Sequence, residues 1–261
     1  MSSAESFSEA ELRQGSIALV ADGFRSGDLA ALNDNLASPG STEQFWLESP
    51  SDIEVSSAFF GWQGRVKRAF DIVGAAAALV LLAPFLILVA AAILFESRGP
   101  IIFVQRREGR DNEPFCALKF RTMSAELCDP SGVRQTIEGD PRVTPLGSFL
   151  RRTSIDELPQ LLNVLRGEMS LVGPRPHVSD MLAGGISYRE LVPYYDRRLL
   201  VRPGLTGLAQ ARGLRGPTVD SSLARRRIDC DLFYVQNFSL WLDIKIIAMT
   251  FRQEFGGGSG A

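Results

Sequence analysis

The sequence is poor in the residues that build many enzyme sites. It contains one histidine, His177, so a Ser-His-Asp triad would have to pass through that residue, and zinc would lack its preferred ligands. The three cysteines, Cys116, Cys128 and Cys230, are an odd number for a disulfide framework and lie too far apart for a zinc pair. Neither a GxxxxGK[ST] loop nor a GxGxxG fingerprint occurs. A reducing compartment is therefore favoured, and any metal should be oxygen-bound, as Mg²⁺ or Mn²⁺ is.

Charge is unevenly distributed along the 261 residues. Residues 1–60 carry ten acidic side chains against Arg13 and Arg25, a net charge of −8. Because the whole chain sums to −2, the remaining residues carry +6. A basic body suits anionic membrane lipids or phosphorylated substrates. Nucleic acid is the competing partner, but no motif for it is present, so we expect no nucleic acid.

An uncharged apolar segment of 24 residues runs from Ile72 to Phe95, with Pro84 at its midpoint. As one helix it would reach about 36 Å, enough to cross a hydrocarbon core of about 30 Å. Basic residues flank both ends, however, and positive charge prefers the cytoplasmic side. A helix broken at Pro84 would form a re-entrant hairpin whose two ends stay on that side. The alternative is an ordinary signal anchor, since proline often only kinks a membrane helix.

The residues just before this segment are typical of a membrane interface. Trp62 and Phe70 stand among Arg65, Lys67 and Arg68, a mixture found at the depth of lipid headgroups. We therefore expect Lys67 and Arg68 to be basic interface residues.

The rest of the pattern divides the chain into four parts. Residues 1–60 are predicted to be a partly disordered acidic extension, 61–99 an interfacial and re-entrant membrane helix, 100–255 a cytoplasmic catalytic domain and 256–261 a flexible tail. Two β-prone runs at 101–105 and 115–120, joined by a polar stretch, predict an antiparallel β-hairpin. Helical periodicity follows at 145–152 and 154–166, and an amphipathic run covers 228–255. The predicted fold is α+β, mostly helical, with interfacial amphipathic helices.

Asp156 and Glu157 are the most prominent candidate site residues. They precede an apolar stripe at helical spacing, with Pro159 in the first turn, so we expect them at a helix N-terminus that favours ionised carboxylates. An ionised Asp held in place is a competent nucleophile or metal ligand. The alternative is structural, because Ser154 and Glu157 also match a capping box.

Several cations could serve a phosphate near these carboxylates. Lys119 and Arg121 end the second β-prone run, Arg151 precedes the acidic pair, and Arg175 lies between two prolines that orient it. A metal-bound diphosphate needs both carboxylates and guanidinium forks. The alternatives are surface salt bridges and, for Arg175, a stiff connection with a solvated side chain. His177 is interpreted as a polar loop residue.

Seven motifs in order resemble a known family. They are Lys67-Arg-Ala-Phe-Asp71, the segment broken by Pro84, Lys119-Phe-Arg-Thr-Met123, Asp140-Pro-Arg-Val-Thr144, Asp156-Glu-Leu-Pro-Gln-Leu161, Gly167-Glu-Met-Ser-Leu-Val-Gly-Pro-Arg-Pro176 and Arg202-Pro-Gly-Leu-Thr-Gly207. Over about residues 61–255 the chain resembles the bacterial sugar transferases, specifically the monotopic polyprenyl-phosphate phosphoglycosyl transferases.

The resemblance implies transfer of a sugar 1-phosphate from a UDP-sugar to undecaprenyl phosphate, with release of UMP, as a first membrane step of polysaccharide synthesis in the bacterial inner membrane. It implies that Asp156 is the nucleophile and that Glu157 assists at a Mg²⁺ site. Lys119, Arg151 and Arg175 would hold phosphates, and Asp231 would be a more distant acidic member. One departure concerns the hinge: the family often has Ser before the proline, whereas this chain has Ala83.

Two other functions are compatible with parts of the sequence. A membrane-anchored scaffold of a polysaccharide assembly complex would use the acidic extension and no catalysis. A single-span peripheral lipid binder would place the two sides of Pro84 on opposite faces of the membrane. The sugar stays open, as does the oligomeric state, a homodimer included.

Overall fold

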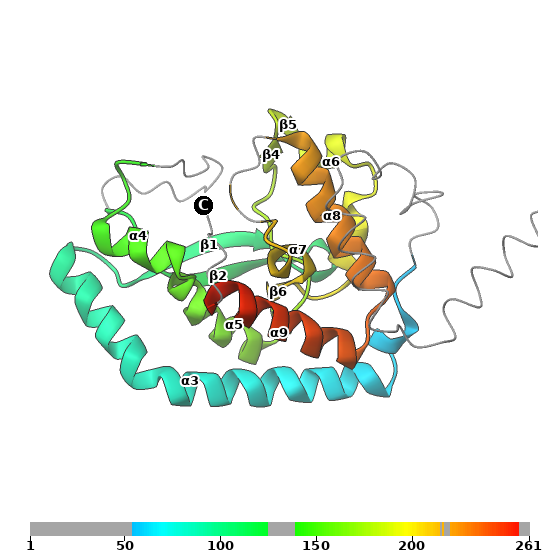
Figure 1. The fold of residues 1–261 in the computed structure, drawn as a ribbon, viewed down its shortest axis with the longest axis horizontal. Helices are drawn as coiled ribbons and strands as arrows, with labels where there is room; N and C mark the ends of the chain where they lie inside the picture. The colour runs from blue at the N-terminus through cyan, green and yellow to red at the C-terminus, as the bar shows by residue number, and fades with distance from the viewer. Residues whose placement is uncertain (1–53, 125–138, 215, 217–219, 256–261) are drawn as a thin grey trace, which may run out of the picture. The chain divides into compact units, whose positions relative to one another are not determined.

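The computed structural model describes residues 54–124, 139–214, 216 and 220–255. Within these ranges the chain is mostly helical and contains three two-stranded sheets, in agreement with the predicted α+β class (Figure 1). The predicted acidic extension up to residue 53 and the predicted tail at 256–261 lie outside the described residues, as does Cys128.

A single long helix, α3 (Trp62–Glu96), contains the apolar segment. In the part of the chain that the structure describes, it is the one helix long and apolar enough to cross a membrane. Pro84 lies inside it and cannot donate the usual backbone hydrogen bond, which is a common cause of a kink. Figure 1 shows that α3 bends towards its carboxyl end. Helix α3 is therefore continuous but bent, and the predicted break into a re-entrant hairpin stays a prediction.

Both halves of α3 pack against the remainder of the protein. Ala75 from the amino-terminal half joins a core cluster with Phe115 and Val164, and Val89 and Ile93 from the carboxyl-terminal half join another. The opposite side of the helix leaves large apolar side chains exposed: Phe70, Ile72, Val73, Val80, Leu81, Phe85, Ile87, Leu88, Leu94 and Phe95. One face of α3 thus belongs to the protein core and the other is apolar and uncovered.

The predicted β-hairpin is present as an antiparallel pair. Strand β1 (Ile102–Glu108) pairs with β2 (Pro114–Phe120), and the short 3₁₀ turn η3 (Arg110–Asn112) lies between them. The amide of Asn163 reaches this pair: its Oδ1 accepts from the N–H of Leu118 at 3.0 Å, and its Nδ2 donates to the carbonyl of Cys116 at 2.8 Å. Asn163 therefore fixes the following helix against β2.

Two short helices and a 3₁₀ segment follow the hairpin. Helix α4 (Pro145–Arg152) begins at Thr144, whose hydroxyl accepts from the N–H of Gly147. The 3₁₀ segment η5 (Ile155–Gln160) leads into α5 (Leu161–Arg166), which ends at Gly167 with a φ of 87°, as predicted for a helix stop. The single helix expected at 154–166 is thus divided into a 3₁₀ segment and an α-helix.

The carboxyl-terminal half builds the other side of the site. Its strands are β3 (Ser170–Val172), β4 (Leu182–Ala183), β5 (Ile186–Ser187) and β6 (Gly204–Thr206), and β3 pairs in parallel with β6. Its helices are α6 (Tyr188–Leu191), η6 (Tyr195–Leu200), α7 (Leu208–Ala211), α8 (Ser221–Gln236) and α9 (Leu240–Phe255). The single amphipathic run expected at 228–255 is therefore two helices.

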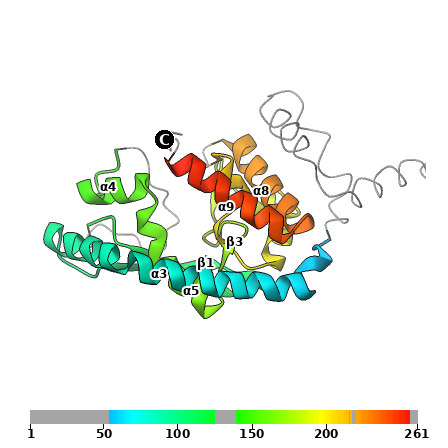
Figure 2. The ribbon, with the colours of Figure 1, turned by 60° about the horizontal axis from the view of Figure 1, so that its bottom comes forward.

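Helix α5 lies beside α3 in both views (Figures 1 and 2). A buried polar cluster joins α3 to this half of the protein. Lys67 Nζ donates to Asp243 Oδ2 at 2.6 Å and to the carbonyl of Val172 at 3.0 Å, and Tyr234 donates to Asp243 Oδ1 at 2.8 Å. Asp71 accepts from the hydroxyl of Ser170 at 3.0 Å. We call these residues the Lys67 cluster.

Candidate active site

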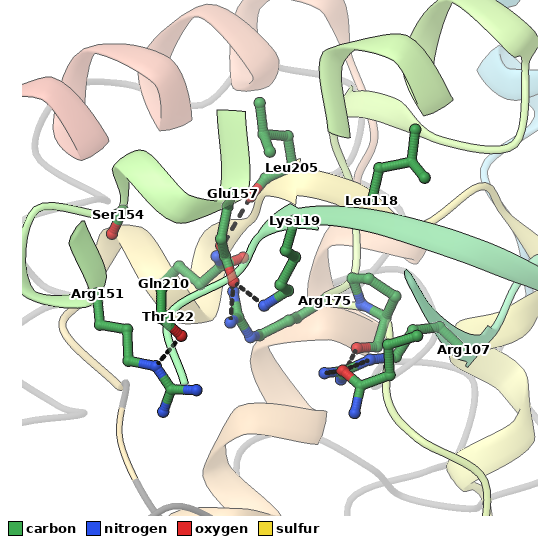
Figure 3. A network of polar contacts seen from close by, with 12 residues as sticks. Arg107, Leu118, Lys119, Thr122, Arg151, Ser154, Glu157, Arg175, Leu205 and Gln210 are labelled. Carbon is green, nitrogen blue, oxygen red and sulfur yellow. Dashed lines mark hydrogen bonds and ion pairs between the residues drawn. The ribbon is translucent and has the colours of Figure 1, made fainter. Parts of the chain in front are cut away.

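Glu157 is held between two cations. Its Oε1 accepts from Lys119 Nζ at 2.6 Å and from Arg175 Nη2 at 2.7 Å, and its Oε2 accepts from Arg175 Nη1 at 3.2 Å (Figure 3). Burial alone would raise the pKa of this carboxyl, but the charges and hydrogen bonds of Arg175 and Lys119 hold the pKa well below its usual range. Glu157 is therefore ionised at neutral pH, and it pairs with both cations.

Asp156 lies next to Glu157, but unlike Glu157 it is not paired with any cation that the structure describes. Its side chain is buried, and among the described residues its carboxylate has no hydrogen bond or ion pair. Burial raises the pKa of the Asp156 carboxyl to about 6, although the positive charge of Lys119 lowers it. At neutral pH the carboxylate is ionised yet poorly solvated, as suits a nucleophile.

The two acids lie in the first turn of a helical segment, as predicted, but this turn is 3₁₀ and its cap differs from the predicted one. Ser154 has a positive φ of 55°, its side chain makes no capping hydrogen bond, and Asp156 and Glu157 lie within the 3₁₀ segment η5. The capping-box alternative for Glu157 is therefore wrong, because its carboxylate binds Lys119 and Arg175 instead. Residues from β2, η5 and the turn after β3 meet at this point.

The turn that carries Arg175 is anchored on either side of it. The carbonyl of Pro174 accepts from the N–H of Gly204 at 2.9 Å, and the carbonyl of Pro176 accepts from Arg107 Nη1 at 3.0 Å. The Arg175 side chain is 41% exposed although it pairs with Glu157. The alternative of a solvated arginine on a stiff connection is wrong, and the guanidinium is still open to a ligand from water.

Arg151 reaches the same region from α4. Its Nε donates to the hydroxyl of Thr122 at 2.7 Å, and its positive charge lowers the pKa of Asp156. Helix α4 can approach this closely because Gly147 lies against the backbone of Thr122, where an added Cβ would come within 2.1 Å of the carbonyl oxygen. Asp231 lies one layer behind the cluster and pairs with Arg198, whose Nη2 reaches Asp231 Oδ2 at 2.8 Å.

A buried carboxylate beside ordered cations is common to several kinds of phosphoryl-transfer site, so comparison with known proteins decides the family. Residues 62–257 match the family described as Bacterial sugar transferase. The chain belongs to the bacterial sugar transferases.

Three relatives illustrate the range of this family. The exopolysaccharide production protein PSS of Rhizobium leguminosarum bv. phaseoli is 54% identical over 195 residues, which are 75% of this chain and 98% of that protein. The UDP-glucose:undecaprenyl-phosphate glucose-1-phosphate transferase of Caulobacter vibrioides is 53% identical over 184 residues, 70% of this chain and 67% of that one. The Escherichia coli protein of the same description is 46% identical over 190 residues, 73% of this chain but 40% of its own. The matched part of this transferase thus spans less than half of the longest of the three.

Three basic residues of this sugar transferase lie elsewhere than the sequence predicted. Arg121, expected to bind phosphate, is buried beyond the end of β2, and it donates to the carbonyls of Pro100 and Ser97 at 2.7 and 2.8 Å. Lys67, expected among headgroups, is buried in the Lys67 cluster. Arg68 donates to the carbonyls of α5, to Val164 at 2.8 Å and to Leu165 at 3.1 Å. These side chains bind the protein's own backbone, so they serve the fold.

The donors of this transferase fit a magnesium ion only in a limited way. No group of three His, Cys, Asp or Glu side chains that could hold a metal occurs in the described ranges. Oε1 of Glu157 accepts from both cations, whereas Oε2 accepts from Arg175 alone, so Oε2 is the oxygen of Glu157 that keeps an acceptor site for a metal. Asp156 is the open oxygen donor, and Mg²⁺ accepts one or two carboxylates when phosphate and water complete its shell.

Sequence reasoning missed a second polar network behind the transferase site. Tyr195 donates to Glu108 Oε2 at 2.8 Å, and its hydroxyl lies 3.0 Å from His177 Nδ1. His177 is buried, and burial together with the charge of Arg198 holds its pKa well below its usual range, so it is neutral. His177 lies in a loop, as interpreted from the sequence, but it is a buried member of this network. No local pattern marks these residues, because each contributes one polar atom from a different element.

Proposed function

We propose that this protein transfers a sugar 1-phosphate from a UDP-sugar to undecaprenyl phosphate, releases UMP and so starts an exopolysaccharide on its lipid carrier. The observation that carries the proposal is the pair of neighbouring acids: Asp156 is buried and has no hydrogen bond or ion pair to any residue that the structure describes, and Glu157 pairs with Lys119 and Arg175. Relatives that are described as undecaprenyl-phosphate sugar phosphotransferases support the choice of substrates.

In the first step an oxygen of Asp156 forms a bond to the phosphorus atom that carries the sugar. The bond from that phosphorus to the bridging oxygen breaks, and UMP leaves with the electron pair. Arg175 and Lys119 are ordered by Glu157 and face the developing charge, which is the arrangement that stabilises phosphoryl transfer. In the second step an oxygen of the lipid phosphate attacks the same phosphorus, and the Asp156 carboxylate is released.

We propose Mg²⁺, with Mn²⁺ as a substitute, as the cofactor. Asp156 would hold it together with phosphate oxygens of the substrate, and the ion would neutralise charge on the diphosphate. Removal of divalent ions by EDTA should abolish UMP release, and added Mg²⁺ should restore it. Full activity in EDTA would contradict this part of the proposal.

The membrane placement we propose is re-entrant, with the catalytic domain on the cytoplasmic face of the bacterial inner membrane. Both ends of α3 contact the same compact unit: Lys67 near the start binds Asp243, and Ser97 just past the end accepts from Arg121. A helix that crossed the bilayer would place these ends on opposite sides. The exposed apolar residues of α9, Trp241, Ile244 and Phe251, would add a second contact with the interface.

Topology is tested by cysteines introduced one at a time at Trp62 and Pro100 in a variant without native cysteines. In oriented inverted membrane vesicles, an impermeant thiol reagent should label both positions equally. Labelling of one position alone would show a single span and would favour the peripheral lipid binder.

Function is tested with the purified protein in detergent, undecaprenyl phosphate and a panel of UDP-sugars, with UMP release as the readout. Asp156→Asn should lower turnover by at least about 10³-fold, and a β-³²P-labelled UDP-sugar should label the wild-type protein but not this variant. Asp111→Asn, at an exposed turn between β1 and β2, is the matched control and should keep full activity. Full turnover in Asp156→Asn would refute the nucleophile, and no UMP with any UDP-sugar would favour a scaffold.

A further inference from the structure

The segment Pro174-Arg175-Pro176 is held by its backbone at every residue. Prolines have no N–H, so carbonyls and the one amide of Arg175 are the available polar groups. The carbonyl of Pro174 accepts from Gly204 of β6, and that of Pro176 accepts from Arg107 of β1. The carbonyl between them, that of Arg175, accepts from Arg198 Nη2 of η6. Three separate elements therefore fix three consecutive carbonyls.

Arg198 is among the most deeply buried side chains described, with 1% exposure. Its Nε and Nη2 donate to Asp231 Oδ2 at 2.9 and 2.8 Å, and its Nη1 donates to the hydroxyl of Tyr195 at 3.3 Å. One guanidinium thus joins Asp231, Tyr195 and the Arg175 carbonyl. Only a planar fork can donate to acceptors in these directions at once.

The carboxylate of Asp231 also contacts the backbone of Arg175. Burial raises the pKa of the Asp231 carboxyl. The charge of Arg198 lowers this pKa, and so does a hydrogen bond from the backbone N–H of Arg175. The ion pair therefore binds both the amide and the carbonyl of Arg175. A buried ion pair often adds little to the free energy of unfolding, so we attribute its role to the geometry that it imposes.

We propose that Arg198 and Asp231 are positioning residues that clamp the Arg175 backbone and thereby aim its guanidinium at Glu157 and at a substrate phosphate. The phosphate part rests on the function proposed above. Neither residue touches the reacting atoms. Their effect on turnover passes through Arg175, whose fork-to-fork contact with Glu157 spans 2.7 and 3.2 Å and depends on where its Cα is held.

The test uses Arg198→Lys, which keeps the charge but cannot form the fork. Because a misplacement of about 1 Å can cost about 100-fold in rate, we expect kcat for UMP release to fall by roughly 10 to 100-fold. Arg189→Lys is the matched control: Arg189 packs on the same Tyr195 ring, at 5.1 Å compared with 5.2 Å for Arg198, and pairs with Glu108. It should change kcat by less than about twofold.

A double-mutant cycle separates positioning from general damage. In an Arg175→Ala background, Arg198→Lys should lower kcat by less than about threefold, because the side chain that it positions is gone. An equal loss in both backgrounds, or no loss in the wild-type background, overturns the proposal. If Arg198→Lys does not fold, Asp231→Glu shifts the same clamp by one methylene and replaces it in the cycle.

Hydrogen exchange gives a readout that does not depend on activity. Between Gly173 and His177 the one backbone amide is that of Arg175, so a peptide covering residues 172–177 reports on it. This amide should be protected in the wild type and in Arg189→Lys, and should exchange at least about tenfold faster in Arg198→Lys. Unchanged protection in Arg198→Lys overturns the clamp, even if no UDP-sugar supports turnover and the proposed function fails.

Discussion

Replacement of Asp156 by Asn is expected to stabilise the fold at neutral pH while it abolishes turnover. The carboxyl is buried, and its pKa rises from an ordinary 3.8 to about 6 in the folded protein. Between these values the folded state binds more protons than the unfolded state, so the free energy of unfolding decreases as the pH rises through this window. The difference of about two pKa units corresponds to about 3 kcal/mol, which is lost above pH 6.

Asparagine does not titrate, so the free energy of unfolding of the variant does not decrease with pH in this window. The free energy of unfolding of Asp156→Asn should therefore match that of the wild type near pH 4 and exceed it by about 3 kcal/mol at pH 8. The measurement is denaturant unfolding in detergent micelles between pH 4 and 8, followed by tryptophan fluorescence. A variant less stable than the wild type at pH 8, or a difference independent of pH, would refute the reasoning.

Glu157→Gln, at the next residue, is the matched control. Its effect on the free energy of unfolding should have the opposite sign to that of Asp156→Asn. The folded-state pKa of Glu157 is lowered, so its stabilisation is present above its ordinary pKa of 4.5 and is lost as the pH falls through the folded value. The substitution leaves Lys119 and Arg175 without their anion. Removal of one partner from a buried ion pair costs about 3–5 kcal/mol, a figure to be discounted here because Arg175 is partly exposed.

Three further outcomes follow from the packing. Asn163→Ala should lower the free energy of unfolding by about 2–4 kcal/mol in a denaturant titration, because it leaves buried backbone groups of β2 without partners; equal stability would contradict this. Gly147→Ala should push α4 away from Thr122 and lower the free energy of unfolding by about 1–3 kcal/mol. It should also lower the rate of UMP release, and an unchanged rate would contradict this. Pro84→Ala should restore a backbone hydrogen bond and straighten α3, so that cysteines at 62 and 100 no longer label equally; retained equal labelling would show that packing bends the helix.

Features set by local pattern were predictable from the sequence. Alternation and turn residues locate the β-hairpin, the uncharged run locates α3, and Gly167 marks the end of α5. The pairing of acids with cations was also foreseeable, because a diphosphate site requires both. Lys119 is the clearest case: it lies on β2 and its ammonium reaches Glu157.

Features that depend on distant partners were not predictable. Lys67 and Arg68 follow the pattern of a membrane flank, but the partner of Lys67 is Asp243, 176 residues away. Arg121 lies two residues after Lys119, yet the strand ends at Phe120 and its side chain turns towards Ser97. Arg198 carries no local signal, because its three partners come from separate parts of the chain.

The Lys67 cluster has a practical consequence for producing this enzyme. Deletion of α3 to obtain a detergent-free protein would remove Lys67, the only cation that pairs with Asp243 among the described residues, and Asp71, which accepts a hydrogen bond from Ser170. The rest of the protein would then expose an apolar core and bury an uncompensated carboxylate, which costs several kcal/mol. A transplant of the domain onto a foreign membrane anchor would fail for the same reason. Helix α3 is a core element of the enzyme that also meets the lipid, so solubilising designs should redesign its outer face and keep its inner one.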